Sequence, residues 1–289
     1  MDPLEKTRIG KTDLQVTLLG LGCSGLARAD TTREAIETFR TAMEQGVRYI
    51  DTAPLYGQGR SEARLGEALK DFDREKIVIS TKVGRLLRST DNYEKSHGYT
   101  PVHNYTRGAI VDSLESSLGR LGVDSVDILY IHDADNHWDQ AIGEGYPALA
   151  EMRDDGKIKA IGAGMNQWEM ELRFAQEGEF DCFLLAGRYT LLEQKAITEF
   201  LPYCEENHIS VVIGGPYNSG VLAKPDGRYN YKEVPPEVSA KVARLQEVCI
   251  KHGVPMRAAA LQFVMTHPAV ASVIPGTKSP RYQEDNFRM

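Results

Sequence analysis

The chain contains 289 residues, 42% of them hydrophobic, and carries 34 basic against 41 acidic side chains, a formal net charge of −7. No stretch reaches the roughly 18 consecutive apolar residues that a membrane helix needs, so we expect no membrane partner. The basic residues are dispersed among acids, which argues against a surface for nucleic acid.

Eight short apolar runs, each followed by a polar or glycine-containing loop, have the length and composition of buried strands. They cover residues 16–21, 47–51, 77–82, 127–132, 160–163, 181–186, 210–213 and 271–274. Between them, apolar residues recur at helical spacing over residues 32–45, 61–70, 106–121, 144–155, 169–176, 193–207, 236–252 and 256–266. This alternation predicts a single-domain (βα)8 TIM barrel over residues 1–289, with its active site at the C-terminal mouth of the strands. A doubly wound open sheet is the alternative.

Two long polar segments, residues 86–105 and 217–234, follow predicted strands and are expected to be loops that form walls of a cleft at the mouth. Four aromatic or histidine side chains are candidates for lining the substrate pocket there: Tyr93, Tyr99, His103 and Trp138.

A glycine pattern, Gly20-x-Gly22-x-x-Gly25, follows the first predicted strand and matches the dinucleotide fingerprint of Rossmann folds. In that fold the helix opens within the glycines, so that its N-terminal amides face the pyrophosphate. Here the helix is predicted to start only at Thr31 or Thr32, too far along the chain. We therefore interpret the glycines as a structural strand-to-helix loop.

The ends of three consecutive strands carry complementary polar residues: Asp51 with Tyr56 shortly after it, then Lys82, then His132. A phenol titrates near pH 10 in water, so proton transfer by Tyr56 at neutral pH needs a nearby cation that favours the phenolate. Lys82 could supply that cation, and Asp51 could hold it in place. His132 could donate to a substrate oxygen or fix its orientation. Each residue alone is ordinary at a strand end, but together they predict a proton-transfer site.

The run Gly46-x-x-x-x-Asp51-Thr52-Ala53-x-x-Tyr56-Gly57, together with Ser80-Thr81-Lys82, resembles the most specific motifs of the aldo-keto reductases. The similarity extends over nearly the whole chain. It implies an NAD(P)-dependent oxidoreductase in which Tyr56 is the general acid/base. Lys82 and Asp51 would tune it, and His132 would orient the carbonyl or alcohol.

The resemblance also implies a nicotinamide cofactor at the barrel mouth. Asn166 matches the residue that binds the nicotinamide amide. The run after the seventh strand would flank the nicotinamide and cradle the pyrophosphate, and its candidate residues are Gly215, Pro216, Tyr217 and Ser219. Gly214 stands where the family has a stacking tyrosine, which makes Tyr217 a candidate substitute.

The adenosine end would be held by residues near the C-terminus: Gly276, Thr277, Lys278, Tyr282, Asp285 and Asn286. A 2′-phosphate needs cations. Gly276 and Tyr282 occupy the places of the family's phosphate-binding Lys and Arg, which favours NAD, whereas Lys278 and Arg281 leave NADP possible. Asp285 and Asn286 match an acid and an amide that contact adenine.

Residues 185–193 and 214–220 resemble the branch of threo-aldose 1-dehydrogenases, which includes L-fucose and L-galactose dehydrogenases, and pyridoxal 4-dehydrogenase. The implied reaction is oxidation of a lactol, pyridoxal or another small alcohol. One alternative is an NADPH-dependent carbonyl reductase of broad specificity. Another is a non-catalytic cofactor-sensing subunit, and a third is a metal-dependent hydrolase, which would need more histidines at strand ends.

Further expectations concern the protein as a whole. The start Met1–Glu5 lacks the regions of a signal peptide, and the four cysteines have no spacing that suits zinc. We expect a cytoplasmic protein with reduced thiols and no metal, present as a monomer or small homo-oligomer. The sequence stops about ten residues into the helix begun by Ser279 and Pro280, whereas relatives continue with more helix and a C-terminal loop; we expect either that this protein lacks them or that the sequence is truncated.

Overall fold

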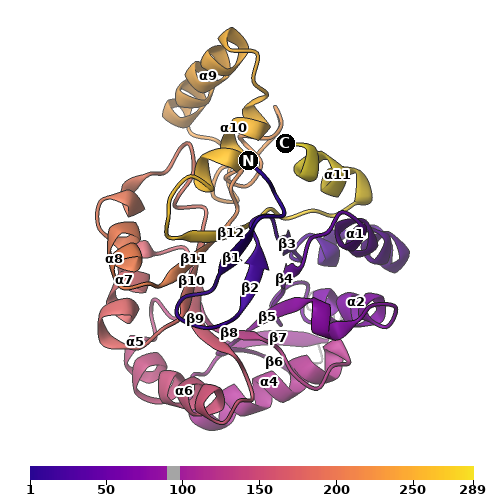
Figure 1. Cartoon of the computed structure of the whole chain (residues 1–289), viewed down its shortest axis with the longest axis vertical. Helices are drawn as coiled ribbons and strands as arrows, with labels where there is room; N and C mark the ends of the chain where they lie inside the picture. Colours follow the sequence, from indigo (N-terminus) through magenta and orange to yellow (C-terminus); the bar gives the residue numbers. More distant parts are fainter. Residues whose placement is uncertain (90–97) are drawn as a thin grey trace.

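The computed structural model describes residues 1–89 and 98–289. Eight parallel strands form the sheet at its centre, in the order β12-β11-β10-β9-β8-β5-β4-β3 (Figure 1). They are β3 (Leu21–Gly22), β4 (Tyr49–Asp51), β5 (Val78–Val83), β8 (Ile128–His132), β9 (Ala160–Met165), β10 (Cys182–Ala186), β11 (Ser210–Gly214) and β12 (Val270–Ile274). Parallel bridges Leu19–Val273 and Gly22–Gly276 join the first strand region to the last and close the barrel. The predicted (βα)8 barrel is confirmed.

Helices surround the barrel (Figure 1): α1 (Thr32–Glu44), α2 (Arg60–Leu69), α4 (Arg107–Leu121), α5 (Trp138–Gln140), α6 (Tyr146–Asp154), α7 (Trp168–Glu177), α8 (Phe200–Glu206), α10 (Met256–Val264) and α11 (Pro280–Arg288). The ends of α1 and α4 follow ordinary capping rules. Thr31 and Thr106 accept hydrogen bonds at the N-termini of α1 and α4, and Gly122 ends α4 in a left-handed conformation. Helix α9 (Pro236–Lys251) projects from the rest (Figure 1). Among the described residues, no helix has the length and apolar character needed to cross a membrane.

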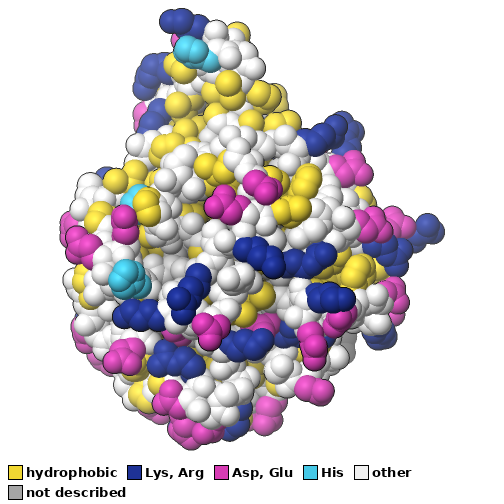
Figure 2. Space-filling model, in the orientation of Figure 1, with side chains coloured by type: hydrophobic (Ala, Val, Ile, Leu, Met, Phe, Trp, Pro, Cys, Tyr) yellow, Lys and Arg dark blue, Asp and Glu magenta, His cyan; other side chains and the backbone are white. Residues whose placement is uncertain are grey.

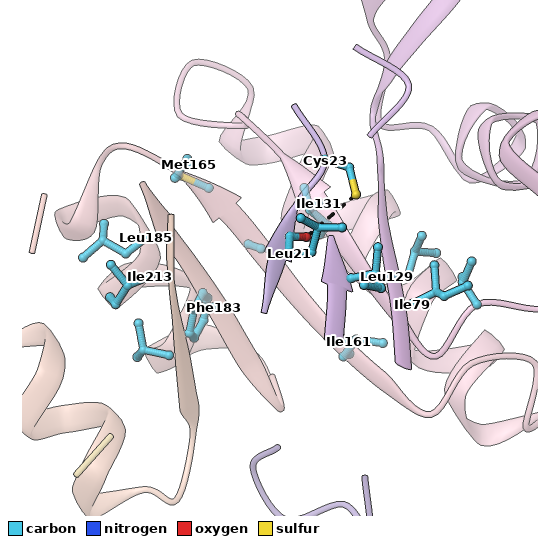
Figure 3. Packing of buried hydrophobic residues seen from close by; sticks show 14 of the residues in the cluster. Leu21, Cys23, Ile79, Leu129, Ile131, Ile161, Met165, Phe183, Leu185 and Ile213 are labelled. Atoms are coloured by element: carbon cyan, nitrogen blue, oxygen red, sulfur yellow. Dashed lines mark hydrogen bonds between the residues drawn. The ribbon is translucent and has the colours of Figure 1, made fainter. Parts of the chain in front are cut away.

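Two apolar cores result from the alternation of side chains along the strands. The larger lies between the strands and the helices, where Ile79, Leu129 and Phe183 pack (Figure 3). The smaller fills the barrel interior and includes Ile9, Leu14 and Val16 from the N-terminal hairpin. This hairpin, β1 (Lys6–Arg8) with β2 (Gln15–Thr17), covers the end of the barrel at which the strands begin.

The N-terminal segment is joined to the last strand by a seam of hydrogen bonds. The Thr7 hydroxyl donates to the Ala271 carbonyl at 2.5 Å, and the Ser272 hydroxyl donates to the Thr17 carbonyl at 2.8 Å. The Gly20 amide donates to the Val273 carbonyl at 2.8 Å. The barrel is therefore complete only when the N-terminal segment meets β12.

Four local predictions differ from the structure. The first predicted strand, residues 16–21, is divided between β2 and β3. The predicted loop 86–105 contains an antiparallel hairpin of β6 (Arg85–Ser89) and β7 (Tyr99–His103). The helix predicted over 193–207 begins only at Phe200, because Pro202 lacks an amide hydrogen and fits only a first turn. The helix predicted over 144–155 begins at Tyr146, after a π-helical turn at Ala141–Gly145.

On the face shown in Figure 2, Lys and Arg side chains and Asp and Glu side chains lie among one another.

Candidate active site

The barrel mouth brings together the four residues predicted from the strand ends. Asp51 ends β4, Lys82 lies near the end of β5 and His132 ends β8, while Tyr56 lies in the turn before α2. The Lys82 ammonium donates to both carboxylate oxygens of Asp51, at 2.7 and 2.8 Å, and to the Thr52 carbonyl at 2.8 Å. Both side chains of this ion pair are only 1% exposed. The pair is therefore shielded from solvent.

The ammonium of Lys82 lies 4.7 Å from the centre of the Tyr56 ring. Burial raises the pKa of Tyr56, Lys82 lowers it, and the net result is a pKa of about 12. The expected effect of the cation is present, but burial outweighs it. Tyr56 is therefore a neutral phenol at physiological pH in this structure, a form suited to donating a proton.

A chain of hydrogen-bonded hydroxyl groups inside the barrel leads to the Asp51 carboxylate. The Ser80 hydroxyl donates to Asp51 Oδ1 at 2.8 Å and lies 3.1 Å from the Tyr49 hydroxyl, which in turn lies 3.1 Å from that of Tyr130. All these side chains are buried. The carboxylate of Asp51 is thus held both by a cation and by a neutral donor.

His132 completes the cluster, with its ring perpendicular to that of Tyr56 and the ring centres 6.2 Å apart. Burial, together with the positive charges of Lys82 and Arg85, lowers the pKa of His132 well below its usual value. The imidazole is therefore neutral and carries one ring proton. It can donate one hydrogen bond through the protonated nitrogen and accept one through the other, and the position of the proton decides which nitrogen does which.

A cavity of about 680 Å³ opens beside Tyr56 and Asp51. Ten of the residues predicted to bind a cofactor line it: Asn166, Gly215, Pro216, Tyr217, Ser219, Gly276, Thr277, Lys278, Tyr282 and Asn286. Asp285 does not line the cavity, because its carboxylate turns to Arg257 at 3.3 Å and to Arg288 at 2.5 Å. Lys82 and His132 also lie outside the lining.

The glycine loop that we interpreted as structural has a place in this cavity, since Gly22, Ser24 and Gly25 line it. A Cβ atom on Gly25 would lie 1.9 Å from the carbonyl oxygen of Thr277. Glycine is therefore required there for a close approach of two backbone segments, both of which line the cavity. The glycine spacing was a usable signal for the cavity, although the fold is not a Rossmann fold.

Several residues that line the cavity were not predicted from the sequence: Arg28, Lys224, Arg228, Asn230, Tyr231 and Arg257. Most come from the segment 217–234, which was predicted only as a wall of the cleft. Arg257 lies in the first turn of α10, and only the packing of that helix brings it to the cavity. Its guanidinium lies 5.9 Å from the ring of Tyr217, whose hydroxyl donates to Asn286 Oδ1 at 2.9 Å.

Of the four side chains predicted to line the substrate pocket, the three that the structure describes lie outside the cavity. Trp138 packs on Phe174 and beneath Arg173, in the outer layer rather than in the cavity. His103 stacks on His137 with ring centres 4.7 Å apart, and Tyr99 is 43% exposed on β7; neither lines the cavity. Tyr93 lies outside the described residues.

All four cysteines are buried free thiols. Within residues 1–89 and 98–289, no three His, Cys, Asp or Glu side chains are grouped closely enough to hold a metal ion.

Comparisons with known proteins agree over almost the whole length. The sequence profile of the Aldo/keto reductase family matches residues 18–289. D-threo-aldose 1-dehydrogenase from a Pseudomonas species is 39% identical over 292 residues, which are 94% of this chain and 89% of the relative. Pyridoxal 4-dehydrogenase from Microbacterium luteolum is 37% identical over 314 residues, with coverages of 98% and 92%. The solved holo form of an aldo-keto reductase from Bacillus halodurans has a TM-score of 0.81 and 26% identity, and the match covers 99% of this chain and 90% of that one.

Proposed function

The chain belongs to the aldo/keto reductase family and is an NAD(P)-dependent oxidoreductase; from this premise, we propose that it oxidises a sugar lactol, pyridoxal or a similar small alcohol with NAD. The observation that carries the proposal is the buried Asp51–Lys82 pair beneath Tyr56, at the edge of the cavity. The names of the two relatives above 35% identity support this substrate class and the direction of oxidation.

The residues that line the cavity fit a dinucleotide. Glycines at positions 214, 215 and 276 leave the backbone open to close approach, while Lys224, Arg228 and Lys278 supply cations for a pyrophosphate. The Asn166 amide nitrogen donates to the Ala186 carbonyl at 2.6 Å, which leaves its oxygen free to accept from a carboxamide. When bound, the cofactor would supply the hydride acceptor.

Oxidation of a lactol to a lactone transfers a hydride from the carbon to the cofactor and releases the hydroxyl proton. We propose Tyr56 as the acceptor of that proton in its phenolate form, and as the donor in the reverse reaction. Lys82 stabilises the phenolate, and Asp51 keeps the ammonium in place. His132 would hydrogen-bond the same substrate oxygen and thereby orient the carbon that loses hydride.

Charge at the adenosine end supports NAD. Gly276 carries no cation, and Tyr282 is uncharged and 45% exposed. Arg257 reaches the cavity but is paired with Asp285, which reduces the positive charge available to a 2′-phosphate. Lys278 is the remaining cation on the segment 276–282 that lines the cavity.

The test has a binding arm and a turnover arm. Dissociation constants for NAD and NADP should favour NAD, and a tenfold preference for NADP, about 1.4 kcal/mol, would contradict the cofactor assignment. Nicotinamide absorbance should report turnover with NAD and a panel of aldoses and pyridoxal. Tyr56→Phe should lose most of kcat while retaining cofactor affinity, whereas the matched Tyr203→Phe on α8 should retain both. Cofactor binding without turnover of any substrate would instead favour the cofactor-sensing alternative.

A further inference from the structure

Asp133, the residue directly after β8, has a left-handed backbone conformation with φ of 48°. Residues other than glycine rarely adopt it, and they do so where the surroundings hold them. The Asp133 amide donates to the Gly164 carbonyl at 3.0 Å. The buried Tyr105 hydroxyl contacts the carbonyls of both His132 and Asp133, at 2.7 and 2.9 Å. These bonds fix the position of Asp133 relative to the imidazole of His132.

In this position the Asp133 carboxylate lies nearest to Nε2 of the His132 ring. Asp133 Oδ2 lies 3.6 Å from His132 Nε2 and also pairs with the Arg85 guanidinium of β6. The other ring nitrogen, Nδ1, is buried and has no hydrogen-bond partner within residues 1–89 and 98–289. The two nitrogens of His132 therefore have very different electrostatic surroundings.

A neutral imidazole carries its proton on one nitrogen only. With the proton on Nε2, the partial positive charge of the N–H lies 3.6 Å from the Asp133 carboxylate without a hydrogen bond between them, so the proton stays available to another acceptor, and the buried Nδ1 presents only a lone pair. With the proton on Nδ1, a donor would be buried without an acceptor, and the Nε2 lone pair would face a negative charge. Both differences favour the proton on Nε2.

We propose that Asp133 is a positioning residue that keeps the ring proton of His132 on Nε2, so that His132 donates a hydrogen bond to the reacting substrate oxygen. Arg85 anchors the carboxylate in this role. During oxidation the substrate proton passes to Tyr56, and the His132 proton stays on Nε2. The identity of the reacting oxygen rests on the proposed function, whereas the position of the ring proton does not.

Two variants of Asp133 remove the negative charge without disturbing the left-handed backbone at this position. Asp133→Asn preserves the shape and tolerates a left-handed backbone, while Asp133→Gly removes the side chain and suits that backbone. Asp135→Asn is the matched control, because this carboxylate lies two residues further along the chain. The full chain, labelled with ¹⁵N-histidine, is studied by two-bond ¹H–¹⁵N correlation spectra with and without NAD, and His132→Gln assigns the signals.

In the wild type we expect a protonated Nε2 and an unprotonated Nδ1 for His132. In both Asp133 variants the proton should distribute between the two nitrogens, and kcat should fall by about tenfold or more with the dissociation constant for NAD unchanged. Asp135→Asn should alter neither. A wild-type proton on Nδ1, or an unaltered Nε2 signal in both Asp133 variants, would overturn the inference. Since the spectra need no turnover, they decide it even if the proposed substrates fail.

Discussion

Removing the carboxylate of Asp51 should destabilise the fold far more than removing one from a surface ion pair. At 2.7 Å and an effective dielectric constant of about 20, the attraction between Asp51 and Lys82 is about 6 kcal/mol, and the loss of hydration by both ions opposes it. Asp51→Asn leaves the ammonium buried with neutral acceptors only, which are the Thr52 carbonyl at 2.8 Å and the new amide oxygen. We expect the free energy of unfolding to fall by about 3–5 kcal/mol.

Urea unfolding followed by circular dichroism measures this loss. Combining Asp51→Asn with Lys82→Met removes both charges, so the double variant should lose less than the sum of the two single variants. Asp71→Asn is the control, because its partner Arg40 is 3.2 Å away and the two side chains are 65% and 46% exposed; its cost should stay below about 1 kcal/mol. A cost for Asp51→Asn as small as that of the control, or strictly additive losses, would refute the reasoning.

The other predictions concern pH and backbone packing. Because the pKa of Tyr56 is about 12 and oxidation needs its phenolate, kcat/KM for oxidation should rise by up to about tenfold per pH unit between about pH 6 and pH 9; a flat profile in steady-state assays would exclude Tyr56 as the base. Burial raises the pKa of Glu171 well above 4.5, so its contribution to stability is present below that pH and is lost as the pH rises. Glu171→Gln should therefore raise the free energy of unfolding by about 1–3 kcal/mol at pH 8 and leave it nearly unchanged at pH 4.5, as urea titrations at the two pH values will report. Gly25→Ala places a methyl group against the Thr277 carbonyl and should weaken NAD binding by about tenfold in a fluorescence titration, whereas Gly108→Ala, with nothing within 4 Å of its Cβ, should not.

The sequence predicted those parts of the molecule that follow from periodicity. Buried parallel strands are short apolar runs, and their carboxyl ends meet at one edge, so Asp51, Lys82 and His132 could be brought together without a structure. The family and its branch, inferred from short motifs, are confirmed by the comparisons. The catalytic roles of these residues remain predictions.

The features that could not be predicted from the sequence depend on tertiary packing. The hairpin β6–β7 is exposed over much of its length, so it lacks the alternation of apolar and polar residues by which a half-buried strand is recognised. Arg257 reaches the cavity only through the position of α10. The net pKa of Tyr56 could not be predicted either, because the sequence shows the cation that lowers it but not the burial that raises it.

The hydrogen-bonded seam between the N-terminal segment and β12 has a consequence for biosynthesis. The Thr7–Ala271 bond joins residues separated by 264 positions. At roughly 5–20 residues per second, a ribosome needs about 13–53 seconds to travel that distance. During this time the nascent chain exposes the edge of its first barrel strand, and the hairpin has no completed barrel end to cover. The closed barrel therefore cannot form before β12 has been synthesised, and until then the unpaired strand edge is open to pairing with another chain.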